Sequence, residues 1–109
     1  MKSIMHSKDE GTCYLCAILN DDYARRTGLH KHHVVFGTAN RKLSEKYGLT
    51  VYLCYEHHED PSSGVAVHHN IEINNMLREQ AQKAFERRFP DKSFREIFGK
   101  NYIGDGVSS

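Results

Sequence analysis

Two short segments of the chain carry the pattern of β-strands. Residues 29–36 end in an apolar run bounded by glycines, and residues 49–53 are rich in β-branched and aromatic side chains. Side chains of these types favour the pleated surface of a sheet, and glycines commonly bound a strand. We therefore expect two short strands.

A short helix is expected between the strands, over residues 41–47. Thr38 or Asn40 can cap its amino end, and Gly48 can end it in a left-handed conformation. Residues 17–27, in contrast, are polar with few apolar positions and predict a loop or a short exposed turn.

A longer helix follows in the second half of the chain. From residue 71 the apolar residues recur at helical spacing, with Asn70 as a candidate N-cap and an end before Pro90. Residues 93–96 match a capping box for a last short helix, which Gly99 would end.

Together these elements predict one small α+β domain over residues 11–103, with a flexible lead-in at residues 1–10 and a flexible tail at residues 104–109. A chain of 109 residues lies near the lower end of the sizes at which a hydrophobic core alone is sufficient. A staple such as a metal would therefore help.

Composition places the chain among soluble globular proteins, with 39% hydrophobic and 27% charged residues. The net charge of only +1 predicts no partner by itself, so a nucleic-acid footprint must come from local basic clusters such as Arg41-Lys42. Residues 1–10 contain no apolar run long enough for a signal peptide or membrane span, which predicts a cytoplasmic protein with no membrane partner.

Cysteine and histidine residues supply the candidate chemistry. Three cysteines cannot all pair, and a reducing compartment disfavours disulfides. Cys13-x-x-Cys16 and Cys54-x-x-His57 form two ligand pairs that fit a four-coordinate structural zinc site. The alternative, that the cysteines are small buried hydrophobes, leaves the second pair unexplained.

Other histidines converge on a second candidate site. His58 follows the zinc ligand His57, and on a helix it projects about 100° away from it, towards the first strand and the pair His32-His33. On a regular strand His32 and His33 point to opposite faces, so they share a site only if the strand ends or kinks there. Several imidazoles with one left unligated are typical of a hydrolytic metal site. For His6 and His69 a surface or core role is the simpler interpretation.

The order of these motifs resembles the zinc-stapled branch of the HNH, or ββα-metal, endonuclease family. The resemblance covers about residues 11–70, and the stretches 29–33, 40–42 and 45–49 are similar to small phage and prophage members, including RecA-dependent recombination-enhancing nucleases. It implies the ββα-metal fold (His-Me finger), stapled by the Cys3His zinc and extended by the carboxy-terminal helix.

The resemblance also implies residue roles. His32 and His58 correspond to ligands of a catalytic divalent metal, and His33 corresponds to the general base. The family's last ligand falls on Ser62 here, so His68 is the candidate, with His69 as the runner-up. Magnesium or manganese would be the working metal, with zinc or nickel as alternatives.

Two further residues complete the expected site. The family's central Asn is missing before the second strand, and Asn40 is expected to orient the base instead. Arg41, with Lys42, is expected to hold a phosphate of the substrate.

The expected function is a metal-dependent DNA endonuclease with no small-molecule cofactor. DNA is its expected partner, and a RecA filament or other phage recombination or packaging proteins are further candidates. The competing interpretation is a catalytically inactive, zinc-stabilised module that binds nucleic acid or protein.

Overall fold

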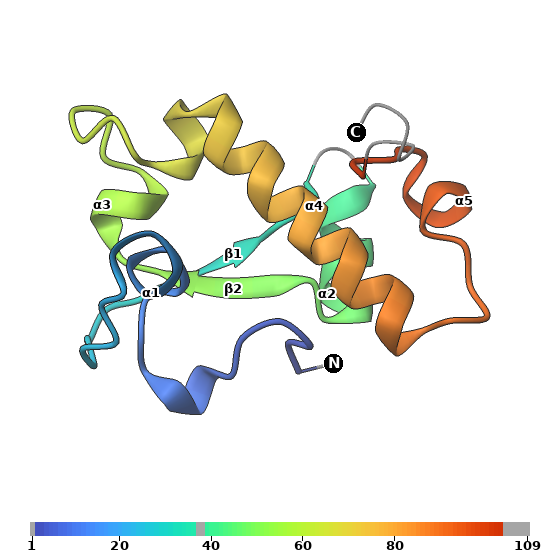
Figure 1. The fold of residues 1–109 in the computed structure, drawn as a ribbon, viewed down its shortest axis with the longest axis horizontal. Coiled ribbons are helices and arrows are strands. Elements are labelled where there is room, and N and C mark those ends of the chain that lie inside the picture. The colour runs from blue at the N-terminus through green and yellow to red at the C-terminus, as the bar shows by residue number, and fades with distance from the viewer. Residues whose placement is uncertain (1, 37–38, 104–109) are drawn as a thin grey trace.

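A two-stranded sheet lies at the centre of the protein, with helices around it (Figure 1). The computed structural model describes residues 2–36 and 39–103. Its elements follow in order along the chain: η1 (Lys8–Glu10), α1 (Tyr14–Asn20), β1 (His30–His33), α2 (Asn40–Tyr47), β2 (Thr50–Leu53), α3 (Tyr55–His58), η2 (Val67–His69), α4 (Ile71–Arg88) and α5 (Phe94–Phe98). The α+β class expected from the sequence is confirmed.

The two strands run antiparallel, with His32 opposite Val51 in the register. The first strand was expected over residues 29–36, but it ends at His33. Just beyond it the buried hydroxyl of Ser44 accepts a hydrogen bond from the Val35 amide (3.2 Å) and donates one to the Val35 carbonyl (2.5 Å). Ser44 of α2 thus forms the hydrogen bonds that the backbone of Val35 would form with a neighbouring strand if β1 were longer.

The outer edge of β2 is covered by the start of the chain. The amide of Ile4 donates to the Gly48 carbonyl (2.9 Å), and the amide of Tyr52 donates to Nδ1 of His6 (3.1 Å). An exposed edge strand is a site for unwanted pairing, and these contacts occupy it. Residues 3–6 of the expected flexible lead-in therefore lie along the sheet, whereas residues 7–10 are exposed.

The expectation of a loop over residues 17–27 is wrong for its first part, because α1 extends to Asn20. Cys13 caps this helix, since its sulfur accepts from the Cys16 amide (3.4 Å), and Leu15 is fully buried beneath it. A helix this short is marginal by itself, and the cap together with burial of its first turn stabilises it.

The other expected helices are present. Gly48 ends α2 with φ 72°, as predicted, whereas Asn40 is the first residue of this helix and not its cap. Thr38, the other expected cap, lies outside the described residues.

The two carboxy-terminal helices begin and end as predicted. Asn70 caps α4 by accepting from the Ile73 amide (3.0 Å), and this helix ends before Pro90. Ser93 caps α5, which Gly99 ends with φ 75°.

An aromatic cluster joins α2, α4 and α5 at one end of the molecule. Phe85 of α4 is fully buried and lies against Tyr47, Phe94 and Phe98, with ring centroids 5.3, 5.5 and 5.9 Å away. Packing of this kind anchors α4 across the sheet.

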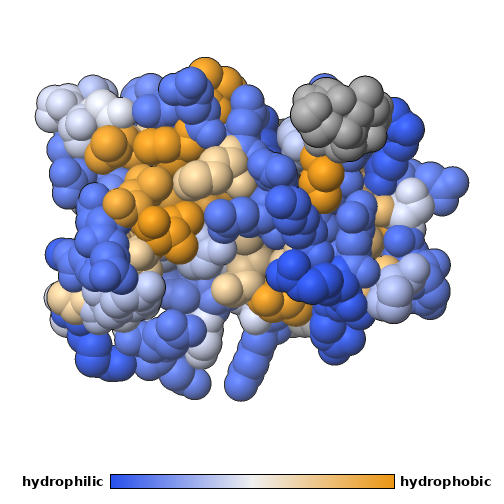
Figure 2. All heavy atoms as spheres, in the orientation of Figure 1, coloured by the Kyte–Doolittle hydropathy of each residue, from blue (hydrophilic) through white to orange (hydrophobic). Residues whose placement is uncertain are grey.

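On the face shown in Figure 2, apolar side chains gather over α1 and the start of α4. Ile18 and Leu19 of α1 are among the exposed large hydrophobic residues. Among the described residues, no helix combines the length and the apolar character needed to cross a membrane.

Candidate functional site

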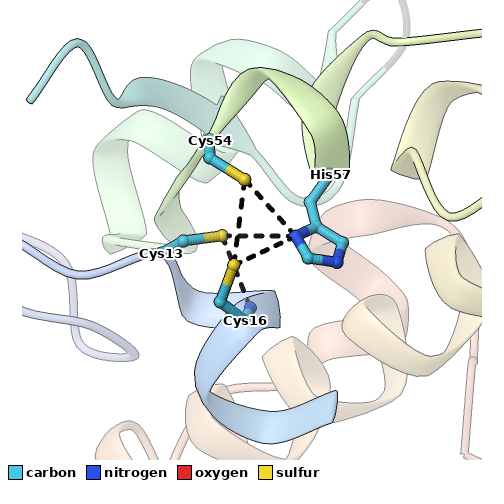
Figure 3. Close-up of side chains that lie close together, drawn as sticks. All are labelled: Cys13, Cys16, Cys54 and His57. Atoms are coloured by element: carbon cyan, nitrogen blue, oxygen red, sulfur yellow. Dashed lines mark hydrogen bonds between the residues drawn. The ribbon is translucent and has the colours of Figure 1, made fainter. Parts of the chain in front are cut away.

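Four side chains from α1, α3 and the residues that precede them point toward one another (Figure 3). They are Cys13, Cys16, Cys54 and His57. Nδ1 of His57 lies 3.7, 3.4 and 3.4 Å from the three sulfurs, and the sulfurs of Cys16 and Cys54 are 3.9 Å apart. With ordinary zinc–ligand bond lengths, tetrahedral geometry places such atoms roughly 3.5–3.8 Å apart. The group is close enough to bind a metal ion, and its spacing is compatible with structural zinc.

The chemistry of the cluster also fits a cation. None of the three cysteines forms a disulfide. Burial, with the neighbouring thiols Cys13 and Cys54, raises the pKa of Cys16 to about 12, so this thiol by itself stays protonated. A bound cation reverses this preference and stabilises the thiolates.

Adjacent residues of α3 face two different sites. His57 points to the sulfurs, while His58 points to a group of imidazoles on the other side of the helix. Since consecutive residues on a helix are about 100° apart, one short turn serves both sites.

The second site joins His32 of β1, His58 of α3 and His68 of η2. Their ring centroids are 4.8 to 5.2 Å apart, and Nε2 of His58 lies 3.2 Å from Nε2 of His68. We call these three residues the imidazole triad. The expected ligands are thus brought together, whereas the exposed runner-up His69 is not part of the group.

The environment of His32 suits a metal ligand. This residue is only 2% exposed, and its Nε2 has no hydrogen-bond partner among the described residues. An unpaired buried nitrogen is costly, and a cation between the rings would satisfy it. Burial, followed by the nearby imidazoles, lowers the pKa of His32 to about 3 and that of His58 to about 4. The rings are therefore neutral and able to ligate at neutral pH.

An outer group of side chains holds His58, and this feature was missed in the sequence. Nδ1 of His58 lies 2.8 Å from Nδ1 of His30 and 3.3 Å from a carboxylate oxygen of Glu59. Partners at one ring nitrogen fix the tautomer and leave the other free for a metal.

His33 lies beside the triad and has a different partner from the one expected. Its Nε2 lies 2.8 Å from Oε1 of Glu45, which also accepts from Lys31 (2.9 Å). Hydrogen bonds from Lys31 and His33 lower the pKa of Glu45 to about 2, so it is a carboxylate. The expectation for Asn40 is not met, because its amide donates to the carbonyl of Phe98 (3.5 Å). Glu45 lies on α2, and no local signal indicated that it would reach His33.

A pocket of about 220 Å³ opens over these side chains. We call it the histidine pocket, and it is lined by Lys31, His32, His33, Arg41, His58 and His68. Arg41 thus lies where it was expected, whereas Lys42 is not among the lining residues. A guanidinium beside neutral imidazoles favours an anion such as a phosphate.

Binding of a divalent metal to the triad is expected to depend little on pH near 6.5, the ordinary histidine pKa. Protons compete with metal only when the imidazoles titrate, and burial depresses these pKa values. Affinity should therefore fall at a pH below the ordinary histidine pKa, and His58 is lost as a ligand as the pH approaches its pKa of about 4. Calorimetric titration with Mn²⁺ of the zinc-loaded protein at several pH values measures this. A steep loss of affinity just below pH 6.5 would contradict it.

No family model, curated protein or solved structure matches this chain.

Proposed function

We propose that this protein is a metal-dependent DNA endonuclease of the HNH type. The observation that carries the proposal is the convergence of three neutral imidazoles on one pocket, next to a fourth imidazole that is held by a carboxylate. The resemblance of the cysteine and histidine motifs to the zinc-stapled branch of that family gives the same assignment.

In the proposed reaction His33 is the general base. Glu45 accepts a hydrogen bond at Nε2 of His33 and so leaves Nδ1 free to take a proton from water. The water oxygen then attacks the phosphorus, and the bond to the leaving oxygen breaks. Glu45 acts as a positioning residue in place of the missing Asn.

The triad of His32, His58 and His68 holds the divalent metal, with magnesium or manganese as the working ion. When bound, the ion supplies stabilisation of the charge that develops on the phosphate and the leaving oxygen. Arg41, which also lines the histidine pocket, binds a phosphate oxygen.

Exchange of His68 for Ala tests the proposal, with His69→Ala as the matched control. Wild type should cleave single-stranded circular or supercoiled DNA when Mg²⁺ or Mn²⁺ is added and stop with a chelator of those ions. Removal of a residue that only hydrogen-bonds to a metal ligand costs roughly 10–100-fold in activity. His68→Ala should lose more cleavage activity than that, because it removes a ligand itself. His69→Ala should cleave like wild type, since the residue is outside the triad.

The competing function is a zinc-stabilised binding module without catalysis. It is favoured by the hydrogen bond from the Asn40 amide to the Phe98 carbonyl, because Asn40 then does not orient His33. Such a module would hold one zinc per chain and no second exchangeable ion. If zinc-loaded protein fails to cleave naked DNA, cleavage of DNA coated with RecA separates a partner-dependent nuclease from the module.

A further inference from the structure

A second, larger cavity lies beside the histidine pocket. It has a volume of about 570 Å³, within the range of small-ligand sites. We call it the lysine cavity, and it is lined by Lys2, Ser3, Ser7, Lys8, Asp9, Lys31 and Tyr52.

The two cavities meet at Lys31, which lines both. Lys31 lies opposite Tyr52 in the strand register, so their side chains are on the same face of the sheet. His33 is two positions further along the same strand and also projects from this face. The proposed general base and the wall of the lysine cavity are therefore neighbours on one surface.

The lining of the cavity is cationic. Three lysines line it together with a single acidic residue, Asp9. Lys31 is paired with Glu45, but within residues 2–36 and 39–103 no ion pair joins Lys2 or Lys8 to a carboxylate. These two ammonium groups are available to a phosphate.

Tyr52 gives the cavity an aromatic wall that is held in place. Its backbone amide donates to Nδ1 of His6, and the two rings are 5.9 Å apart. His6 itself is buried, and its Nε2 lies 3.2 Å from the hydroxyl oxygen of Thr12. An aromatic ring fixed beside lysines is the combination that binds single-stranded nucleic acid by base stacking.

We propose that the lysine cavity binds a nucleotide next to the scissile phosphate of a single strand, with its base on Tyr52 and its phosphate near Lys2 and Lys8. This rests on the proposed nuclease function and names the substrate class. Bases in a duplex are stacked and paired, so they reach such a wall only at the cost of unpairing.

The test is binding of a short fluorescent oligothymidylate, measured by anisotropy with Mg²⁺ in a His33→Ala background that does not cleave. Tyr52→Leu should weaken binding about ten-fold or more, because stacking on the ring is removed, whereas Tyr52→Phe should bind like the parent. Tyr23→Leu, which changes an exposed tyrosine outside both cavities, is the matched control.

A second pair of variants tests phosphate binding independently of the ring. Lys2→Ala/Lys8→Ala should reduce the slope of log affinity against log salt by about 0.7 for each phosphate that is no longer neutralised. Lys92→Ala/Lys100→Ala removes two exposed lysines elsewhere and should leave the slope unchanged.

The outcomes separate this inference from the proposed function. Unchanged affinity in Tyr52→Leu and in the Lys2/Lys8 variant, while unmodified protein cleaves DNA, overturns the cavity assignment alone. If Tyr52→Leu and the Lys2/Lys8 variant lose as much affinity for a duplex as for an oligothymidylate of the same length, the assignment to single strands is overturned. A decrease specific to single strands, without metal-dependent cleavage of either naked or RecA-coated DNA by unmodified protein, supports the cavity as a strand-binding site and overturns the nuclease.

Discussion

Stripping the metal from the Cys3His cluster is expected to unfold the protein. Binding of structural zinc contributes on the order of 10 kcal/mol in small zinc modules, which is comparable to the whole stability of a typical domain. The cluster joins the start of α1 to α3, and Cys13, Cys16 and His57 are buried. Circular dichroism and thermal melting during titration with a strong zinc chelator measure the unfolding.

Cys13→Ser should give the same result without a chelator, because it removes one thiolate ligand, whereas a serine hydroxyl can still cap α1. Readdition of Zn²⁺ should refold chelated wild type, whereas Mg²⁺ should not, since thiolates prefer the softer ion. A Cys13→Ser variant that melts like wild type would refute the zinc assignment.

Exchange of His33 for Ala is expected to slow cleavage by about 10²–10⁴-fold, the usual contribution of a general base. His33 is not part of the imidazole triad, so metal binding should persist. The comparison is a single-turnover cleavage rate together with a Mn²⁺ titration. His32→Ala should differ by losing the metal as well as the activity.

The melting temperature of His33→Ala serves as the control for folding, because this variant also removes a partly buried hydrogen bond to Glu45. Equal cleavage by His33→Ala and wild type, from preparations free of contaminating nuclease, would move the general base to another residue.

Local signals in the sequence predicted much of the fold. The Cys3His cluster could be predicted because the two ligands of each pair are closely spaced in the chain and are brought together by a single turn. The caps Asn70 and Ser93 and the stop at Gly48 were predictable because the groups that they satisfy are neighbours in the chain. The first part of α1 was not predicted, because its N-cap is the sulfur of Cys13, a residue that the sequence indicated only as a metal ligand.

Interactions between residues far apart in the chain were harder to predict from the sequence. The choice between His68 and His69 depends on how η2 sits over the sheet, which no spacing rule determines. The partner of His33 was wrongly expected to be Asn40, because the side of α2 that faces β1 is set by packing against the aromatic cluster and not by sequence distance.

The placement of His57 and His58 on one four-residue helix has a thermodynamic consequence. A metal ion on His57 would hold the same turn that aims His58 at His32 and His68, so metal binding at the Cys3His cluster and at the imidazole triad would be linked. The sites should fill in order, structural ion first, and a chelator that empties the first should lower the affinity of the second. By the reciprocity of linkage, a metal in the triad should in turn tighten the binding of zinc.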